Sequence, residues 1–187
     1  MKKLRIFIVA LAGFLATATM ANAERIEADL TGYEEVPSVN TVASGEFSAR
    51  ISRDEQSIEY VLKYRNLQGT VSQSHIHIAQ LSVNGSIVIW LCQTEGTFLD
   101  PTKLAPQCPA GQATEAIVTG KITAANVIAG STTSQQLNAN DLASVIAAIR
   151  AGAAYANVHT LPLSGGGEIR GQIEAKGDKD RKDKDDK

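Results

Sequence analysis

The sequence predicts an all-β protein, an antiparallel Greek-key sandwich or barrel with one short helix. Most of the chain after residue 23 alternates apolar and polar side chains with a period of two, which is typical of half-buried strands. Turn signals separate these runs, and only one stretch has the spacing of a helix. Many short strands with a single helix favour a sandwich or a barrel.

Seven runs with strand character follow one another along the chain. In the second run, Ile58, Tyr60 and Leu62 share one face, and charged side chains fall on the other. The run that begins with the turn signal Asn84-Gly85 is apolar on both faces, which predicts a central strand. The runs are residues 45–52, 57–67, 73–79, 84–93, 115–124, 155–160 and 167–175.

One helix is expected between the fifth and sixth runs. Asn140 or Asp141 stands at the N-cap position, and Gly152 follows the last turn. The apolar positions between them have the i, i+3, i+4, i+7 spacing of a helix with one buried face. These positions are Leu142, Val145, Ile146 and Ile149.

The two ends of the chain differ from this domain. Residues 1–23 begin with basic side chains, continue through an apolar run and close on Ala21-Asn22-Ala23, which is the pattern of a secretory signal peptide. The alternative is an uncleaved N-terminal anchor, which would have the same basic residues and apolar run but would not need the small residues at its end. Residues 175–187 read as a charged, disordered tail. We expect a secreted or periplasmic protein whose domain covers residues 24–174, with no transmembrane segment after signal cleavage.

The charge of the expected domain argues against one class of partner. Of the 18 Lys and Arg and the 20 Asp and Glu in the chain, 9 and 15 fall within residues 24–174, a formal charge of about −6. Nucleic acid is therefore not expected, because binding to phosphates needs a basic face. An extracellular protein partner stays open, and the sequence does not determine the oligomeric state.

The two cysteines of the chain, Cys92 and Cys108, are expected to form a disulfide. Both follow the signal, in a chain sent to an oxidising compartment. The segment between them is rich in proline and reads as irregular structure. A cysteine pair that binds a metal is the alternative.

The three histidines of the chain are a candidate metal site. His75 and His77 lie one residue apart in a predicted strand, so they share a face, with Cα atoms about 6 to 7 Å apart. Ile76 and Ile78 take the core face, which predicts that both imidazoles lie on the outer surface. His159 lies in another run, and if the two strands are neighbours the three neutral imidazoles suit copper or zinc. The alternative is three hydrogen-bonding surface histidines.

Four charged residues are candidates for supporting roles. Glu168 and Arg170 share one face of their run, which predicts either a cross-strand salt bridge or a pair that orients the metal ligands. Glu34 and Glu35 form adjacent carboxylates that could serve acid–base work or bind calcium. Their place before a proline-bearing loop favours a solvated turn.

Several segments, taken in order, resemble the CHRD domain, a family first named from chordin and found in many secreted bacterial proteins. The resemblance covers nearly all of residues 28–173. It is most specific at AGAAYANVHT (residues 151–160) and GGEIRGQI (residues 166–173), and it includes LTGYEEVP, SHIHIA, NGSIVIWLC and VTGKITAANV. It implies an immunoglobulin-like or superoxide-dismutase-like β-sandwich in an extracytoplasmic setting, and it brings no settled activity.

The order of the histidines is also similar to the copper side of copper–zinc superoxide dismutase. By this likeness His75, His77 and His159 would stand where three copper ligands stand. Arg170 would stand near the arginine that guides the anion. The chain has no further histidine to bridge to a second metal and no zinc-binding loop, so a dinuclear site is excluded.

Three functions follow from these observations. The first is a secreted CHRD-type binding module with a mononuclear copper or zinc site. The second is a small extracytoplasmic copper enzyme acting on superoxide or another oxidant, with Arg170 attracting the anion. The third is a structural or adhesive module in which the histidines are incidental. Whether the protein is an enzyme stays open.

Overall fold

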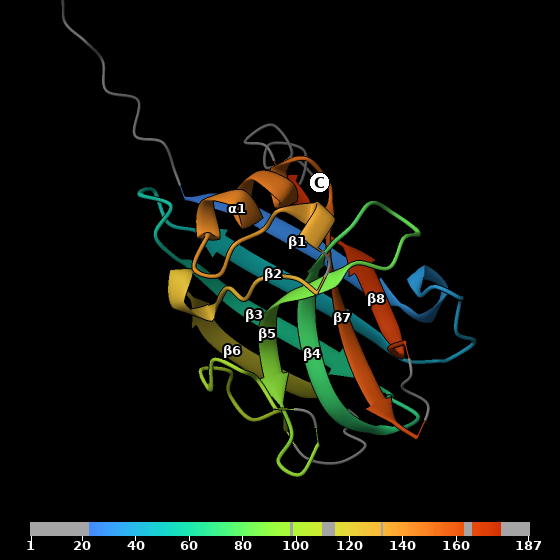
Figure 1. Cartoon of the computed structure of the whole chain (residues 1–187). Helices are drawn as coiled ribbons and strands as arrows, with labels where there is room; N and C mark the ends of the chain where they lie inside the picture. Colours follow the sequence, from blue (N-terminus) through green and yellow to red (C-terminus); the bar gives the residue numbers. More distant parts are fainter. Residues whose placement is uncertain (1–22, 98, 110–114, 132, 163–165, 177–187) are drawn as a thin grey trace, which may run out of the picture.

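The computed structural model describes residues 23–97, 99–109, 115–131, 133–162 and 166–176, and within them most of the chain is β-strand (Figure 1). The strands are β1 (Glu24–Thr31), β2 (Ser44–Ile51), β3 (Ile58–Arg65), β4 (Thr70–Ile78), β5 (Ser86–Gln93), β6 (Ala116–Ile122), β7 (Ala154–Leu161), β8 (Ile169–Gln172) and β9 (Glu174–Lys176). Within the described residues, no helix is long and apolar enough to cross a membrane.

All the strands belong to one antiparallel sheet that curls into a nearly closed barrel. The order across the sheet is β5-β4-β7-β8-β1-β2-β3-β6, and β9 pairs with β1. One half of the sheet is β5-β4-β7-β8 and the other is β1-β2-β3-β6. The chain crosses from one half to the other after β3, after β5 and after β6. Figure 1 shows the two edge strands, β5 and β6, approaching each other where the barrel closes. The predicted all-β class, with antiparallel crossing connections, is confirmed.

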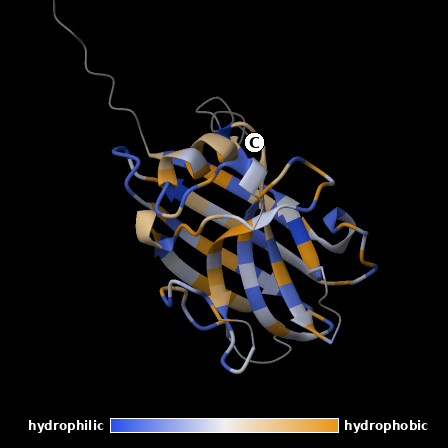
Figure 2. Cartoon of the chain, viewed as in Figure 1, coloured by the Kyte–Doolittle hydropathy of each residue, from blue (hydrophilic) through white to orange (hydrophobic). Residues whose placement is uncertain are grey.

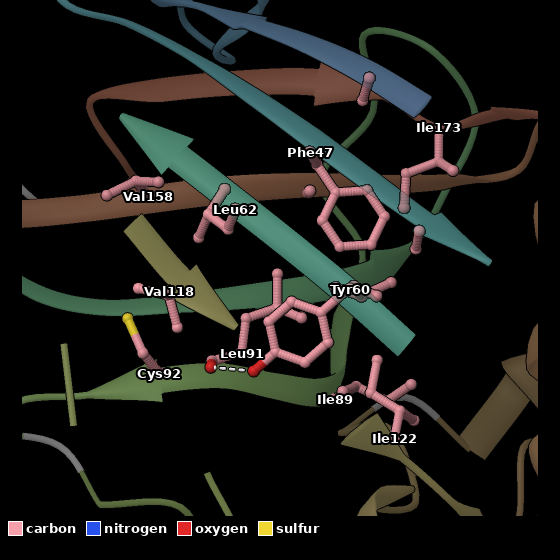
Figure 3. Packing of buried hydrophobic residues seen from close by; sticks show 14 of the residues in the cluster. Phe47, Tyr60, Leu62, Ile89, Leu91, Cys92, Val118, Ile122, Val158 and Ile173 are labelled. Carbon is pink, nitrogen blue, oxygen red and sulfur yellow. Dashed lines mark hydrogen bonds between the residues drawn. The ribbon is translucent and has the colours of Figure 1, made fainter. Parts of the chain in front are cut away.

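The interior of the barrel holds the hydrophobic core. Along the strands, apolar and polar residues alternate as the period of two predicts (Figure 2). Phe47 of β2 and Tyr60 of β3 stack inside with ring centroids 6.2 Å apart. The hydroxyl of Tyr60 crosses the core and donates a hydrogen bond to the carbonyl of Leu91 in β5 at 2.5 Å (Figure 3). The core therefore joins the two halves of the sheet.

The first strand, β1, is absent from the seven predicted runs although its pattern is present in the sequence. Ile26, Ala28 and Leu30 are buried and alternate with polar residues that face out. At the other end, β9 includes Ala175 and Lys176, which were expected to begin the charged tail. Residues 1–22 and 177–187, which hold nearly all of the expected signal and tail, lie outside the described residues.

The helix forms where it is expected and packs against β7 and β9. It is α1 (Leu142–Arg150), and the carboxylate of Asp141 accepts a hydrogen bond from the backbone N–H of Ser144 at 3.0 Å. Asp141 is thus the N-cap. Gly152 ends the helix in the left-handed region, with φ of +67°. Three short 3-10 helices complete the described elements: η1 (Gly32–Glu34), η2 (Ala124–Asn126) and η3 (Thr133–Gln135).

Candidate metal centre

The two strands that carry the histidines are neighbours in the sheet. β4 pairs with β7, so that His75 lies opposite Asn157, His77 opposite Tyr155, and Gln73 opposite His159. The three histidines therefore converge, with one ligand atom from each within 4.8 Å of the others. Adjacency of these strands was the condition on which the predicted site depended.

The histidines face away from the barrel interior, as predicted, but they are not on the molecular surface. Ile76 lies fully buried in the core, and the imidazoles take the opposite face of β4. The relative exposure is 0% for His75, 6% for His77 and 8% for His159. The expectation of surface imidazoles is wrong because Trp90, Tyr155 and the loop carbonyl of Gly85 pack against them on this face of the sheet.

The loop of residues 79–85, between β4 and β5, lies against His77. Its carbonyl at Gly85 lies 3.0 Å from Nδ1 of His77, and the hydroxyl of Tyr155 lies 3.3 Å from the Gly85 nitrogen. The side chain of Asn84 donates to the carbonyl of Val36, at 3.0 Å, which ties this loop to the one after η1. Two loops are thus joined to each other beside His77.

Each histidine has distinct neighbours. The ring of His75 lies nearly perpendicular to that of Trp90, with centroids 4.4 Å apart, and neither of its nitrogens has a hydrogen-bond partner among the described residues. Because a carbonyl can only accept, Nδ1 of His77 carries the proton in its bond to Gly85, which leaves the lone pair on Nε2. Nε2 of His159 lies 2.8 Å from the amide nitrogen of Asn157.

Burial keeps the first two imidazoles neutral. Burial is the largest cause that lowers the pKa of His75 well below its usual value, and the nearby His159 and His77 lower it further. For His77 burial again dominates and brings the pKa to about 4, against a weaker raising effect from the Gly85 carbonyl. Neutral imidazole is the form that binds a metal ion. Both rings therefore have the required protonation state at neutral pH.

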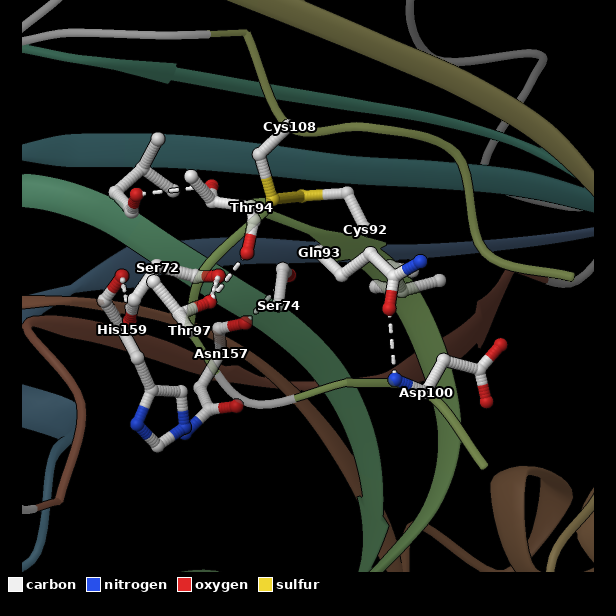
Figure 4. Close-up of a disulfide and its surroundings, with 12 residues drawn as sticks. Ser72, Ser74, Cys92, Gln93, Thr94, Thr97, Asp100, Cys108, Asn157 and His159 are labelled. Atoms are coloured by element: carbon white, nitrogen blue, oxygen red, sulfur yellow. Dashed lines mark hydrogen bonds between the residues drawn. A yellow bond between two sulfur atoms is a disulfide. The ribbon is translucent and has the colours of Figure 1, made fainter. Parts of the chain in front are cut away.

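The disulfide predicted between Cys92 and Cys108 is present, and the loop that it closes is fastened beside β4 (Figure 4). The Thr97 hydroxyl and the Thr94 backbone N–H donate to the carbonyl of Ser72, at 3.0 and 2.9 Å. The Ser72 hydroxyl in turn donates to the carbonyl of His159 at 3.2 Å. The loop closed by the disulfide therefore supports the backbone at one end of the histidine cluster.

Comparison with known families gives one match, to the CHRD domain, over residues 26–173. The chain belongs to the CHRD domain family. No curated protein and no solved structure matches it. The match agrees with the resemblance seen in the sequence and covers every strand except the first two residues of β1 and the whole of β9. It does not identify a ligand, so the chemistry of this CHRD domain has to come from its own residues.

Arg170 and Glu168 of the CHRD domain do not pair with each other. The guanidinium carbon of Arg170 lies 3.4 Å from the ring centroid of Tyr155, and the group donates to the carbonyl of Val83 at 2.9 Å and to Asn84 at 3.3 Å. Because β7 lies between β4 and β8, Arg170 and His77 approach Tyr155 from opposite sides. Arg170 thus reaches the cluster through Tyr155, and the predicted cross-strand salt bridge is wrong.

Glu168 instead joins three segments of the chain, at Thr41, at residues 68–69 and at Thr160. One carboxylate oxygen accepts from the Thr41 hydroxyl at 2.8 Å and from the backbone N–H of Gln68 at 2.8 Å. The other accepts from the Thr160 hydroxyl at 2.6 Å and from the backbone N–H of Gly69 at 3.3 Å. These contacts fully employ its carboxylate in holding the loops to β7.

Glu35 is buried, contrary to the solvated turn expected for Glu34 and Glu35. It is 3% exposed, and its two oxygens have no hydrogen-bond partner among the described residues. Burial raises its pKa to about 8, against the lowering effect of the charge on Arg170. Nothing in the local sequence distinguishes it from Glu34, because its burial depends on the loop that folds over β8.

Proposed function

We propose that this CHRD domain is an extracytoplasmic binding module that holds one transition-metal ion, with copper as the first candidate and zinc as the second. The ligands are His75, His77 and His159. Tyr155 stacks on His77 and positions it, and Arg170 packs on the ring of Tyr155. Glu168 holds the loops around the cluster.

The burial of the three imidazoles is the observation that carries this proposal. A buried polar atom without a partner costs about 1–3 kcal/mol, so folded proteins rarely keep several together. Here both nitrogens of His75 and Nε2 of His77 are buried without partners among the described residues. A bound metal ion would satisfy the facing lone pairs at once, since it takes neutral imidazoles as ligands.

The donor set favours copper or zinc over harder ions. Three imidazole nitrogens suit zinc and copper, whereas calcium and magnesium take oxygen ligands. The group of described residues that could close on one ion consists of the histidines alone. Copper(II) binds a given nitrogen site more tightly than zinc in the general order of divalent metals. With three protein ligands, a fourth position would stay available for water or a small ligand.

An extracytoplasmic location is supported by three features. The N-terminal sequence has the pattern of a secretory signal. The disulfide between Cys92 and Cys108 is of the kind that persists in oxidising compartments. The CHRD resemblance points the same way. The partner of such a module would be an extracellular protein, and no described feature identifies it.

The structure does not favour the redox enzyme as the first choice. In that hypothesis Arg170 attracts an incoming anion, but the residue is 0% exposed and its guanidinium is engaged by Tyr155 and the carbonyl of Val83. A charge sheltered in this way steers a solvent anion poorly. The purely structural alternative gives no role to the buried nitrogens of His75 and to Nε2 of His77, which have no hydrogen-bond partner among the described residues. We therefore place metal binding first.

The proposal is tested by the metal content and the copper electron paramagnetic resonance spectrum of the chain from residue 24, purified from a periplasmic extract. The expected result is one copper per chain with nitrogen hyperfine structure, lost in the His75→Ala/His77→Ala variant and in His159→Ala. Asn126→Ala is the matched control, because Asn126 is another buried polar side chain, at 9% exposure, in the distant η2.

Because His75 and His77 are buried, their truncation also opens space in the fold, so the folding of each variant needs a check. Circular dichroism of each variant supplies it. Stoichiometric copper retained by a folded double variant would rule out this site. An absence of metal uptake by the parent protein would return the histidines to a structural role.

A further inference from the structure

Asn157 lies among the three histidines. On β7 it precedes His159 by two residues and shares its face, and across the ladder it is the partner of His75. Its side chain is 1% exposed. Its amide nitrogen Nδ2 lies 2.8 Å from Nε2 of His159. The amide of Asn157 therefore binds His159 and lies on the residue that pairs with His75 across the ladder.

The bond between Asn157 and His159 has a defined direction. An amide NH₂ group donates hydrogen bonds and cannot accept them. Nε2 of His159 must then be the unprotonated nitrogen, with its lone pair directed at the amide. A metal ion bound at Nε2 would need this same lone pair. The amide and the ion are therefore competitors for one atom.

The spacing of the imidazoles is compatible with an amide held among them. Nitrogens on a tetrahedral zinc ion, at about 2.0–2.1 Å each, stand about 3.3–3.4 Å from one another. The ligand atoms of His75, His77 and His159 lie within 4.8 Å of one another. Small side-chain rotations would bring them onto an ion once the amide has moved.

We propose that Asn157 locks the metal-free site, with its amide bound to the lone pair of His159 until an incoming ion displaces it. This inference rests on the proposed metal-binding function and adds the residue that controls loading. The carbonyl oxygen Oδ1 of Asn157 is buried without a hydrogen-bond partner among the described residues, so rotation of the amide breaks only its bond to His159. The lock is therefore weak enough to open and lowers the affinity for the ion.

The test compares the parent, Asn157→Ala and the control Asn126→Ala in competition titrations of copper(II) and of zinc(II) against a chromophoric chelator. Removal of one hydrogen bond that competes with the ion should tighten binding by Asn157→Ala about 2- to 10-fold. The control should bind as the parent does. Asn157→Leu, which preserves side-chain volume, is measured in parallel in case the smaller side chain prevents folding.

A second readout needs no metal. In nitrogen-15 spectra of the metal-free parent, His159 should be the tautomer with the proton on Nδ1, and Asn157→Ala should lose this preference. Tighter binding together with the tautomer change supports the lock. If the parent binds metal but neither Asn157 variant binds more tightly, the lock is wrong and the metal site stands. If none of the proteins binds metal, the proposed function fails and the lock fails with it.

Discussion

The ring of His77 lies parallel to the ring of Tyr155, with an interplanar angle of 5° and centroids 4.6 Å apart. The guanidinium of Arg170 lies against the same tyrosine from β8. His77 is therefore held in two ways, by this stack and by the bond of its Nδ1 to the Gly85 carbonyl. Residues that fix the plane and the tautomer of a ligand affect metal affinity nearly as much as the ligands themselves.

The first prediction concerns this stack. Tyr155→Leu removes the ring that orients His77 and should weaken metal binding about 10-fold or more, the usual effect of losing a residue that supports a ligand. Tyr155→Phe is the control, because it keeps the ring and should keep affinity within about 3-fold. The measurement is the dissociation constant from chelator competition. Equal affinities for the two variants would show that the stack does not position His77.

The sequence reveals the face of each histidine more readily than its burial. Alternation with Ile76 is enough to place His75 and His77 together, away from the core. Their burial depends on contacts between segments far apart in the chain: Trp90 lies against His75, and the loop of residues 79–85, tied to Val36 through Asn84, lies against His77. No periodicity encodes such contacts, so a surface location was inferred.

Other parts of the site were within reach of the sequence. In YANVHT, Tyr155 and Asn157 share the face of His159, and strand pairing was the missing step that made them its neighbours. The strand β1 could likewise have been predicted from its alternation of apolar and polar residues. Glu35 is different, because an acidic residue beside another acidic residue gives no sign that one of them is buried.

Glu35 should make the domain less stable as the pH rises. Its pKa in the folded protein is about 8, against 4.5 in the unfolded chain, so the folded state retains a proton that the unfolded state has lost. Its contribution to stability is complete below pH 4.5 and is lost as the pH rises toward 8 and above. Between pH 6.5 and 8 the loss should be about 2 kcal/mol. Urea unfolding of the metal-free protein measures it.

Glu35→Gln is the matched variant for this test, since it keeps the shape of the side chain and removes the ionisation. The decrease in the free energy of unfolding between pH 6.5 and 8 should disappear, and the variant should be more stable than the parent at pH 8. A parent protein whose stability does not change across this interval would show that the Glu35 carboxyl reaches solvent. Arg170 is the charged group that lowers the pKa of Glu35, against the larger raising effect of burial.

His77 should give the opposite dependence at lower pH. Its pKa is about 4 in the folded protein and 6.5 in the unfolded chain, so the unfolded state binds the proton first. Stability is complete above pH 6.5 and falls as the pH decreases toward 4, by about 3 kcal/mol from this residue. The measurement is urea unfolding of metal-free Glu35→Gln, in which the opposing carboxyl is absent. Stability that stays constant from pH 6.5 to 4.5 would contradict the neutral, buried imidazole.

The disulfide should matter mainly for stability. Because the bond between Cys92 and Cys108 closes a loop with a sequence separation of 16 residues, the chain-entropy estimate for the double Cys→Ser variant is a loss of about 3 kcal/mol. Chemical denaturation of the parent with and without reductant, beside the variant, measures this. Addition of reductant should lower the stability of the parent to that of the variant and leave the stability of the variant unchanged. A reductant effect on the variant would mean that something other than this bond is responsible.

The last prediction concerns Glu168, whose carboxylate accepts hydrogen bonds from Thr41, Thr160 and two backbone amides. Glu168→Gln replaces one accepting oxygen by a donor and removes the charge that strengthens the other contacts, so the domain should lose about 3 kcal/mol. Glu46→Gln is the control, because Glu46 is exposed on β2 and should change stability by less than about 0.5 kcal/mol. Equal unfolding midpoints in urea for the two variants would show that Glu168 does not hold the loops, and metal affinity measured on both would then reveal whether its effect is on the site alone.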